Sequence, residues 1–415
     1  MYIIESIREE IKEQGDDMVR KLNLTWFILV TVFLFMLNQA HSFSQSPLDP
    51  NAEVEQIASQ ILQPEGPVWK DGVGLLFSDI RGNKIYQWTP ENGKEVYLDP
   101  SDNTNGLTYD LQGRLVAGQM GLRRIVRFEE DGTQVSLADQ YDGKKLNSPN
   151  DLVVKSDGAI FFTDPDFNIP QGESKELSFN GIYRISPSGE LQLLESSLTL
   201  PNGICFSPDE SKLYVNDSQA HKIYEWDVVD DSTITNKQLL YSIPVNGYAD
   251  GMKIDEDGNI YCTCSSAVWV VSPSGEDLGK IDLPSNVSAS NCAWGETDNR
   301  TLFITAGSSV YKVRPLVSAV GDQGSILPTE PKLFQNYPNP FNPSTMISFD
   351  LLSPEIVTLK IYNSIGEEIE TLVQGKLQAG QHEIHWSANN LTSGIYFCSL
   401  IAGSFHDSKK MIFQN

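Results

Sequence analysis

The sequence predicts an all-β protein, a six-bladed β-propeller followed by a small C-terminal β-sandwich. Two observations predict this fold. Turn-rich segments with Asp-Gly-type turns recur along the chain, each leading into a pair of β-rich segments, and the recurrence has a period of about forty to fifty residues. Short strands at such a period are typical of propeller blades. A β-sandwich array is the alternative, but it would not need six similar units. The first strand residues of the repeats, 39, 45, 53, 47 and 42 residues apart, are Leu76, Leu115, Ile160, Leu213, Ile260 and Leu302.

The N-terminal region is expected to be a signal peptide, residues 1–44. The apolar run LTWFILVTVFLFML follows Arg20 and Lys21 and is short for a membrane span, but it has the length of a secretory h-region. Met18 is the alternative start, because MVRKLN is an ordinary n-region and the acidic stretch before it is not. An uncleaved anchor is the other reading of this segment.

The propeller is expected to span residues 50–315. The strand-like segment AEVEQIASQI, residues 52–61, precedes the first repeat. We expect it to return to the last blade and complete it, which would close the ring without leaving an exposed strand edge.

The pattern changes after Arg314. Residues 316–332 are expected to be a linker. Within residues 333–415, apolar residues alternate with polar ones in three short segments, of which ISFDL beginning at Ile347 is one. Alternation of this kind predicts a small antiparallel sandwich with one buried face on each sheet.

The C-terminal segment resembles the sorting domain of type IX secretion cargo. The residues that carry the resemblance are NYPNPFNPST, YNSIGEEI and LTSGIYFCSLIAG, which together cover most of 333–415. The resemblance implies recognition by the type IX secretion machinery and export through the periplasm, so that the protein is secreted or held at the cell surface. It implies no catalysis in this segment.

Charge and composition limit the partners. The chain has 415 residues and a formal charge of −25, which disfavours nucleic acid and anionic membranes as partners and favours cations. We expect membrane contact only through the signal segment. The five cysteines are odd in number, have no CxxC spacing and are expected to be buried free thiols. His221 is the only histidine in the predicted propeller, which disfavours a histidine zinc site or a Ser/His/Asp triad.

Oxygen-bearing side chains recur where new blades begin. Glu65 lies between a proline and a glycine just before an apolar run, where a lone buried carboxylate would be costly. Asn150, Asn202 and Asp250 lie at similar turns in later repeats. Because the innermost strands of a propeller line its channel, we expect these four residues to converge there. Two carboxylates and two amide oxygens suit Ca²⁺, with Mg²⁺, Mn²⁺ and Zn²⁺ as alternative ions. Turn formation is the alternative role for such residues.

The same segments resemble the regucalcin/gluconolactonase family of six-bladed propellers. The resemblance runs from about residue 60 to 314 and is carried by EGPVW, NTNGLTYD, LNSPNDLVVKSDGAIFFTDP, LPNGICFSPDESKLYV, ADGMKIDEDGNIY and NCAWG. It implies that Glu65, Asn202 and Asp250 hold a divalent cation. It also implies that Asn150 lies beside the cation, on the metal or on the substrate, and that Asp250 is the acid/base residue.

The expected function is metal-dependent hydrolysis of a sugar lactone, by metal-assisted attack of water on the ester carbonyl. Asp250 and Asn150 are the candidate catalytic residues, while Asn105, Gln119 and Asn150 are the candidate substrate-binding residues. At Met120, many relatives have a histidine, so the identity of the lactone is left open. The alternatives are a secreted propeller that binds calcium or another ligand without catalysis, and a phosphotriesterase-type hydrolase.

Overall fold

The computed structural model describes residues 48–49, 51–230, 232–245, 247–315, 331–388 and 391–414. The expected signal peptide, residues 1–44, and nearly all of the expected linker, residues 316–332, lie outside the described residues. The expected domain boundaries therefore stay predictions. The described part of the chain contains no helix with the length and apolar character that crossing a membrane requires.

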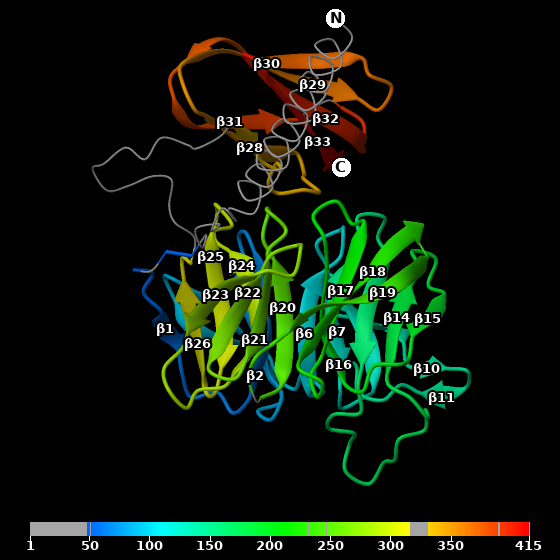
Figure 1. Cartoon of the computed structure of the whole chain (residues 1–415). Helices are drawn as coiled ribbons and strands as arrows, with labels where there is room; N and C mark the ends of the chain where they lie inside the picture. Colours follow the sequence, from blue (N-terminus) through cyan, green and yellow to red (C-terminus); the bar gives the residue numbers. More distant parts are fainter. Residues whose placement is uncertain are drawn as a thin grey trace, which may run out of the picture. The chain divides into compact units, whose positions relative to one another are not determined.

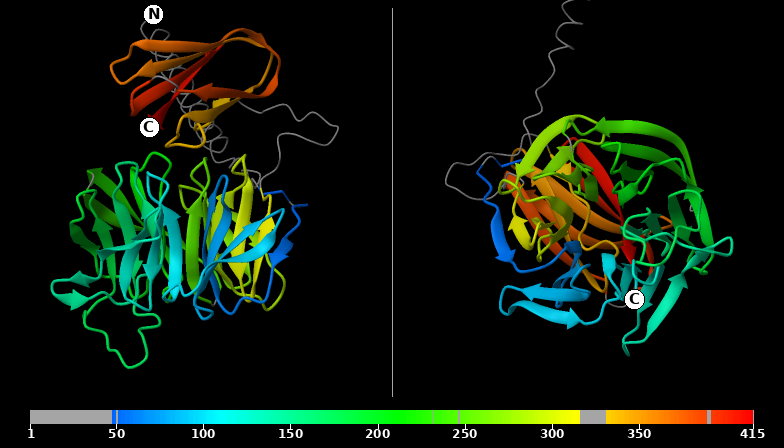
Figure 2. Two further views of the ribbon diagram at one scale, coloured as in Figure 1. Left: turned by 180° about the vertical axis from the view of Figure 1, so that it is seen from behind. Right: turned by 90° about the horizontal axis from the view of Figure 1, so that it is seen from below.

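Six four-stranded antiparallel sheets form the propeller, as the repeats predict (Figure 1). Viewed along the axis, the sheets follow one another around a ring (Figure 2). Blade 1 contains β2 (Pro64–Lys70), β3 (Gly74–Asp79), β4 (Lys84–Thr89) and β5 (Gly93–Leu98). Blade 2 contains β6 (Thr104–Tyr109), β7 (Leu115–Gln119), β8 (Arg124–Phe128) and β9 (Gln134–Ala138). Blade 3 contains β12 (Leu152–Val154), β13 (Ile160–Asp164), β14 (Gly181–Ile185) and β15 (Leu191–Glu195).

The second half of the ring follows the same order. Blade 4 contains β16 (Pro201–Phe206), β17 (Lys212–Asp217), β18 (Lys222–Asp230) and β19 (Thr233–Ser242). Blade 5 contains β20 (Ala249–Ile254), β21 (Ile260–Cys264), β22 (Ala267–Val271) and β23 (Asp277–Asp282). The six residues that mark the repeats in the sequence all lie on the second strand of a blade.

Blade 6 closes the ring with a strand from the other end of the propeller. It contains β24 (Ala289–Gly295), β25 (Thr301–Ala306), β26 (Ser309–Val313) and, as its outermost strand, β1 (Glu55–Ala58). β1 pairs with β26 in antiparallel register, Glu55 opposite Lys312. The expectation that residues 52–61 complete the last blade is thus confirmed, and the early and late parts of the propeller are hydrogen-bonded together.

The core of the propeller lies between neighbouring blades. The middle strands are buried over nearly their whole length, as in LLFSD of β3 and IFFTD of β13. Phe161 of blade 3 packs edge-on against Phe206 of blade 4, with ring centroids 4.9 Å apart. The five cysteines are buried and free, as expected.

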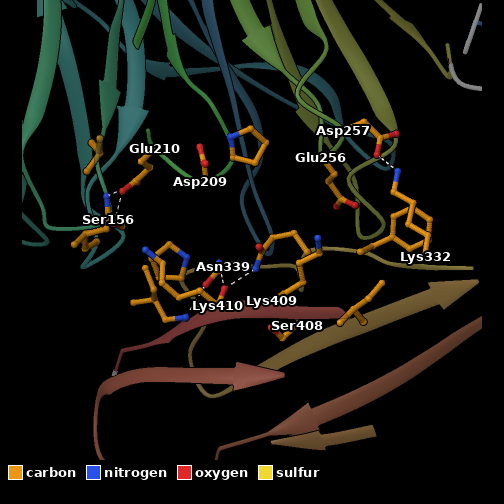
Figure 3. Close-up of a pocket in the computed structure, with 18 residues that line it drawn as sticks. Ser156, Asp209, Glu210, Glu256, Asp257, Lys332, Asn339, Ser408, Lys409 and Lys410 are labelled. Atoms are coloured by element: carbon orange, nitrogen blue, oxygen red, sulfur yellow. Dashed lines mark hydrogen bonds and ion pairs between the residues drawn. The ribbon is translucent and has the colours of Figure 1, made fainter. Parts of the chain in front are cut away.

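Polar contacts also join neighbouring blades at their turns. Ser156, in the turn after β12, donates from its backbone amide to Glu210 in the turn after β16, over 2.7 Å, and its hydroxyl donates to the same carboxylate (Figure 3). Lys155 lies 3.5 Å from the Glu210 carboxylate. These contacts link blades 3 and 4 and do not involve the candidate site residues.

Blade 3 carries two additions. A hairpin of β10 (Gln140–Tyr141) and β11 (Lys144–Lys145) precedes its first strand, and a long segment, residues 165–180, joins β13 to β14. Both project from the same end of the ring (Figure 1). Arg123, which is 1% exposed, anchors them: its guanidinium donates to the carbonyl of Leu146 (2.6 Å) and to the Glu173 carboxylate (2.9 Å).

The C-terminal domain is a separate β structure of two sheets. One contains β27 (Lys332–Leu333), β28 (Ser344–Leu351) and β31 (Gly380–Ser387); the other contains β30 (Glu368–Leu377), β29 (Glu355–Asn363), β32 (Gly394–Ala402) and β33 (Phe405–Phe413). Alternating residues from the two sheets form one apolar core, including Ile347, Phe349 and Leu359. The alternation in the sequence therefore predicts the buried face correctly.

Candidate metal centre and active site

The site is built from equivalent positions at the start of the innermost strands. In most of the blades, the ladder between the first and second strands is irregular at this point. The irregularity re-aims the side chains next to it. Aligning the strands by this register gives one residue per blade, and the six residues are Glu65, Asn105, Asn150, Asn202, Asp250 and Ser290. We call them the axial ring.

Five of the six blades fix the backbone of the next blade's axial residue. A short polar side chain on a second strand donates a hydrogen bond to the axial carbonyl of the next blade. The donors and acceptors are Ser78 to Asn105 (2.8 Å), Thr163 to Asn202 (2.8 Å), Asn216 to Asp250 (2.5 Å) and Thr263 to Ser290 (2.9 Å). Blade 2 has Gly118 at this place, and there the amide of Gly106 donates to the carbonyl of Asn150 (2.9 Å). The ring is therefore held by contacts between blades.

The residue after the axial residue is glycine in four blades, and close packing requires it. A Cβ at Gly66 would lie 2.2 Å from the carbonyl oxygen of Asn105, and Gly66 also has a positive φ of 46°. A Cβ at Gly203 would lie 2.5 Å from the carbonyl oxygen of Asp250. Glycine at this place allows the inner strands to approach one another closely at the axis.

Glu65 is the more buried of the two axial carboxylates, with 4% of its surface exposed. Its carboxylate accepts a hydrogen bond from the Gly66 amide over 2.9 Å. Burial, and to a smaller degree the negative charge of Asp151, raise the pKa of Glu65 to about 7. The Gly66 amide, a hydrogen bond from Asn291 and the charge of Lys253 act in the opposite direction. The carboxylate is thus held in a site that penalises its charge.

Asp250 shares this environment with Glu65. Its side chain is partly buried, and burial followed by the negative charge of Glu65 raises its pKa well above the usual range. A hydrogen bond from Asn202 lowers the pKa and only partly offsets these effects. A positive charge beside two such carboxylates would stabilise their ionised forms.

Three axial asparagines present unused oxygens. Asn105, Asn150 and Asn202 are 3–5% exposed, and within the described chain their Oδ1 atoms have no hydrogen-bond partner. The amide of Asn202 is oriented by the donation of its Nδ2 to the Ser218 hydroxyl, over 3.1 Å. A buried carbonyl oxygen without a hydrogen-bond partner lowers the stability of the fold. A cation that binds to such oxygens would remove this cost.

These features fit a hard divalent cation. Two carboxylates with raised pKa values and several unpaired amide oxygens lie on one ring, and oxygen ligands of this kind are those that Ca²⁺ prefers. Among the residues that the structure describes, no group of three or more His, Cys, Asp and Glu side chains is arranged to hold a metal. A cation at this ring would therefore depend on the asparagine oxygens as well as on Glu65 and Asp250.

Gln119 lies at a different kind of position. It pairs with Thr104, the residue before the axial Asn105, as Asp79 pairs with Pro64 in blade 1. Its amide nitrogen Nε2 donates to the carbonyl of Ser101 (3.2 Å), and its Oε1 accepts from Arg124 (2.6 Å). In these contacts Gln119 resembles Asp79, whose carboxylate accepts from backbone amides in the segment before β2. The structure thus does not show a free Gln119 amide, and its expected substrate contact stays a prediction.

Sequence reasoning did not single out three polar residues that follow axial residues along the chain. Asp151 and Asn291 occupy the place that is glycine in the other four blades, and Lys253 follows Asp250 on β20. Asp151 and Asn291 each have a side chain where the other blades have glycine. The Oδ1 atom of each accepts a hydrogen bond from the backbone amide of the next residue. The sequence already shows this departure. The axial residue and the residue after it read ND in blade 3 and SN in blade 6, but EG, NG, NG and DG in the other blades.

Two family models match the chain. The SMP-30/Gluconolactonase/LRE-like region matches residues 63–308, and the Secretion system C-terminal sorting domain matches residues 335–414. The first match covers the propeller with its axial ring, and the second covers the β-sandwich. The sorting domain indicates a secreted or cell-surface protein.

Individual relatives agree with the first match. A gluconolactonase from Zymomonas mobilis subsp. mobilis is 36% identical over 294 residues, which cover 64% of this chain and 82% of the relative. A regucalcin from Oryctolagus cuniculus is 26% identical over 248 residues, covering 58% and 82% respectively. Among solved structures, a gluconolactonase from Xanthomonas campestris has a TM-score of 0.61 and 33% identity, and the match covers 66% of this chain and 93% of that one.

Proposed function

This chain belongs to the SMP-30/gluconolactonase/LRE-like family, and from that premise we propose that it hydrolyses sugar lactones at the axial ring. The observation that carries the proposal is that Glu65 and Asp250, whose pKa values are both raised by burial and whose charges interact, share one ring with axial asparagines that have unused oxygens. The lactonase names of the relatives point to a cyclic ester as the substrate.

Glu65, Asn150, Asn202 and Asp250 would hold a divalent cation, of which Ca²⁺ fits the all-oxygen donor set best. When bound, such a cation supplies polarisation of the ester carbonyl and stabilises the negative charge that develops on its oxygen. The acidic charge of the whole chain, −25, favours the approach of cations over anions.

Asp250 is the residue that we assign as general base. It is partly exposed, whereas Glu65 is 4% exposed and accepts a hydrogen bond from the Gly66 amide, so Asp250 is the carboxylate with access to water. The raised pKa of Asp250 belongs to the cation-free chain. With a cation bound this pKa would fall, and a water molecule beside the cation would become easier for Asp250 to deprotonate. Asp250 would take a proton from water as the water oxygen attacks the carbonyl carbon. It would return that proton to the ring oxygen as the bond between the acyl carbon and the ring oxygen breaks, which completes the hydrolysis.

Asn105 and Asn150 would orient the sugar or the attacking water. Both are axial, and each has an amide whose Oδ1 makes no hydrogen bond within the described residues. Their backbones are held by neighbouring blades, Asn105 by Ser78 and Asn150 by Gly106, so their positions do not depend on the ligand. Preorganised amides of this kind lower the cost of orienting a substrate.

The test is a substrate panel on the purified full-length chain. Sugar lactones such as glucono-1,5-lactone, aryl esters and organophosphates would be assayed with Ca²⁺, Mg²⁺, Mn²⁺ or Zn²⁺ and after treatment with a chelator. We expect lactone turnover that the chelator abolishes and that added Ca²⁺ restores. Turnover of organophosphates alone would assign the site to phosphotriester hydrolysis instead, and binding of Ca²⁺ without turnover of any substrate would make the propeller a non-catalytic binder.

A further inference from the structure

A charged contact joins two blades that are not neighbours in the ring. Lys253 on β20 of blade 5 and Asp151 at the start of blade 3 approach to 3.5 Å between Nζ and Oδ2. Blade 4 lies between these two blades in the ring, so the contact does not belong to the packing of adjacent sheets. Asp151 directly follows the axial Asn150, and Lys253 lies three residues after the axial Asp250, so the contact is close to the axial ring in the sequence of both strands.

Asp151 is an unusual residue for this position. Four of the six blades have glycine there, and the Asp151 side chain is 1% exposed. Oδ1 accepts from the Leu152 amide (3.0 Å), whereas Oδ2 has no hydrogen bond within the described residues. A buried carboxylate of this kind requires a compensating positive charge nearby.

Lys253 is the positive charge that the inner strands offer. The six innermost strands contain two basic residues, Lys70 and Lys253, and Lys70 lies at the last residue of β2, where its Nζ donates to the Gly113 carbonyl. The Lys253 ammonium donates to the Met252 carbonyl (2.9 Å) and lies 3.5 Å from Asp151 Oδ2. Lys253 thus brings a positive charge next to the buried Asp151 carboxylate.

The same ammonium acts on the axial ring. The charge of Lys253 favours the ionised form of Glu65, whereas the charge of Asp151 disfavours the ionised forms of both Glu65 and Asp250. The four groups thus form one electrostatic unit. When all are ionised, its three carboxylates and one ammonium leave two negative charges, which is the charge that a single divalent cation neutralises.

We propose that Lys253 is a built-in counter-charge for Asp151, which sets the affinity of the axial ring for one divalent cation. The inference rests on the cation site of the proposed function. Lys253 and Asp151 are positioning residues in this account, because neither is assigned to the substrate or to the cation. Together they are neutral, so removing either one alone changes the potential at the ring, in opposite directions.

The experiment compares four forms of the full-length chain by titration calorimetry with CaCl₂ after chelator treatment: wild type, Asp151→Asn, Lys253→Met and the double variant. We expect Asp151→Asn to weaken calcium binding about tenfold and Lys253→Met to strengthen it about tenfold, since each changes the charge near the ion by one unit. The double variant should return to within about twofold of wild type. Lys212→Met is the matched control, because it removes a lysine that pairs with Asp227 (2.7 Å) between the second and third strands of blade 4, and it should leave the affinity unchanged.

Single variants that both weaken calcium binding, or that leave it unchanged, would overturn the inference and reduce the pair to a structural contact. If Lys253→Met does not fold, as judged by circular dichroism, Lys253→Gln makes the same charge change with a polar side chain. A wild-type chain that does not bind calcium would contradict the proposed cation site itself. Lactone turnover, measured separately, does not enter this comparison, so a failed substrate assignment leaves the test of the charge pair intact.

Discussion

The two β domains of this chain bury polar groups in opposite ways. In the sorting domain, the core is apolar, and its buried polar side chains Asn336 and Thr345 hydrogen-bond to each other. The unpaired buried atoms described there, Asp350 Oδ1 and Gln381 Nε2, belong to half-buried side chains. At the axial ring of the propeller, the charge of the buried Glu65 raises the pKa of Asp250, and three buried asparagine oxygens have no hydrogen-bond partner within the described residues. Since unpaired buried polar groups cost stability, the comparison separates a region built for folding from a region built for a ligand.

The largest effect is expected from Asp250→Asn, which keeps the shape of the side chain and removes its basicity. Lactone turnover should fall by about a thousandfold or more, the range typical for loss of a general base. The thermal midpoint of the calcium-free protein should not fall, because the change removes one member of a repelling pair. Initial rates and melting curves measure the two outcomes, and near-normal turnover would remove Asp250 from its assigned role.

A change in the sorting domain should have the opposite signature. Phe349 is fully buried and stacks on His382, so Phe349→Ala should destabilise the sandwich by about 3–5 kcal/mol. Lactone turnover by the soluble protein should stay within twofold of wild type. Urea unfolding followed alongside the lactone assay distinguishes the domains, and a parallel loss of turnover would show that the two regions are not independent.

Calcium affinity should depend on pH through the raised pKa of Glu65. Because burial raises this pKa to about 7, the carboxyl group is largely protonated at pH 6 in the calcium-free protein, and calcium must displace the proton. We expect affinity to decrease by up to about tenfold per pH unit for each proton released as the pH falls below about 7. Calorimetry in buffers of different ionisation enthalpy counts the protons, and Glu65→Gln, which has no titrating group there, should reduce the slope.

The smallest effect is expected at Gln119. Its side chain is hydrogen-bonded to Ser101 and Arg124, so Gln119→Ala should cost about 1 kcal/mol of stability through lost hydrogen bonds. If those contacts are its whole role, KM for lactones should stay within about twofold of wild type. A large rise in KM with unchanged stability would instead support the substrate contact expected from the sequence.

Much of the architecture was predictable from local patterns. Repeats of turn-rich segments predict the six blades, and the apolar alternation around Ile347 and Leu359 predicts the buried face of the sandwich. The six markers fall one in each blade, and Leu76 and its equivalents all lie on second strands. Periodicity fixes the spacing of repeats, but the strand that lies nearest the axis depends on how whole blades pack together.

The site was only partly predictable. Glu65, Asn202 and Asp250 could be selected because each stands beside a glycine at a blade start, and the structure gives Asp250 an electrostatic contact with Glu65 and a hydrogen bond with Asn202. Asp151 and Lys253 could not be paired from the sequence, because 102 residues and an intervening blade separate them. The tie of Gln119 to Arg124 likewise depends on the register between β7 and β8.

By itself, the sequence determined the repeat, the closing strand, the apolar faces and the kinds of oxygen-bearing side chain at the blade starts, because these follow from short-range periodicity and side-chain chemistry. Only the tertiary structure decided which of those oxygens are left unpaired and which charges lie close to one another. The physical reason is ring closure: hydrogen bonds between neighbouring blades, such as that from Ser78 to the Asn105 carbonyl, bring distant residues to one axis. Near that axis, the electrostatic interaction between buried charges extends over several ångströms and is not limited to residues in contact.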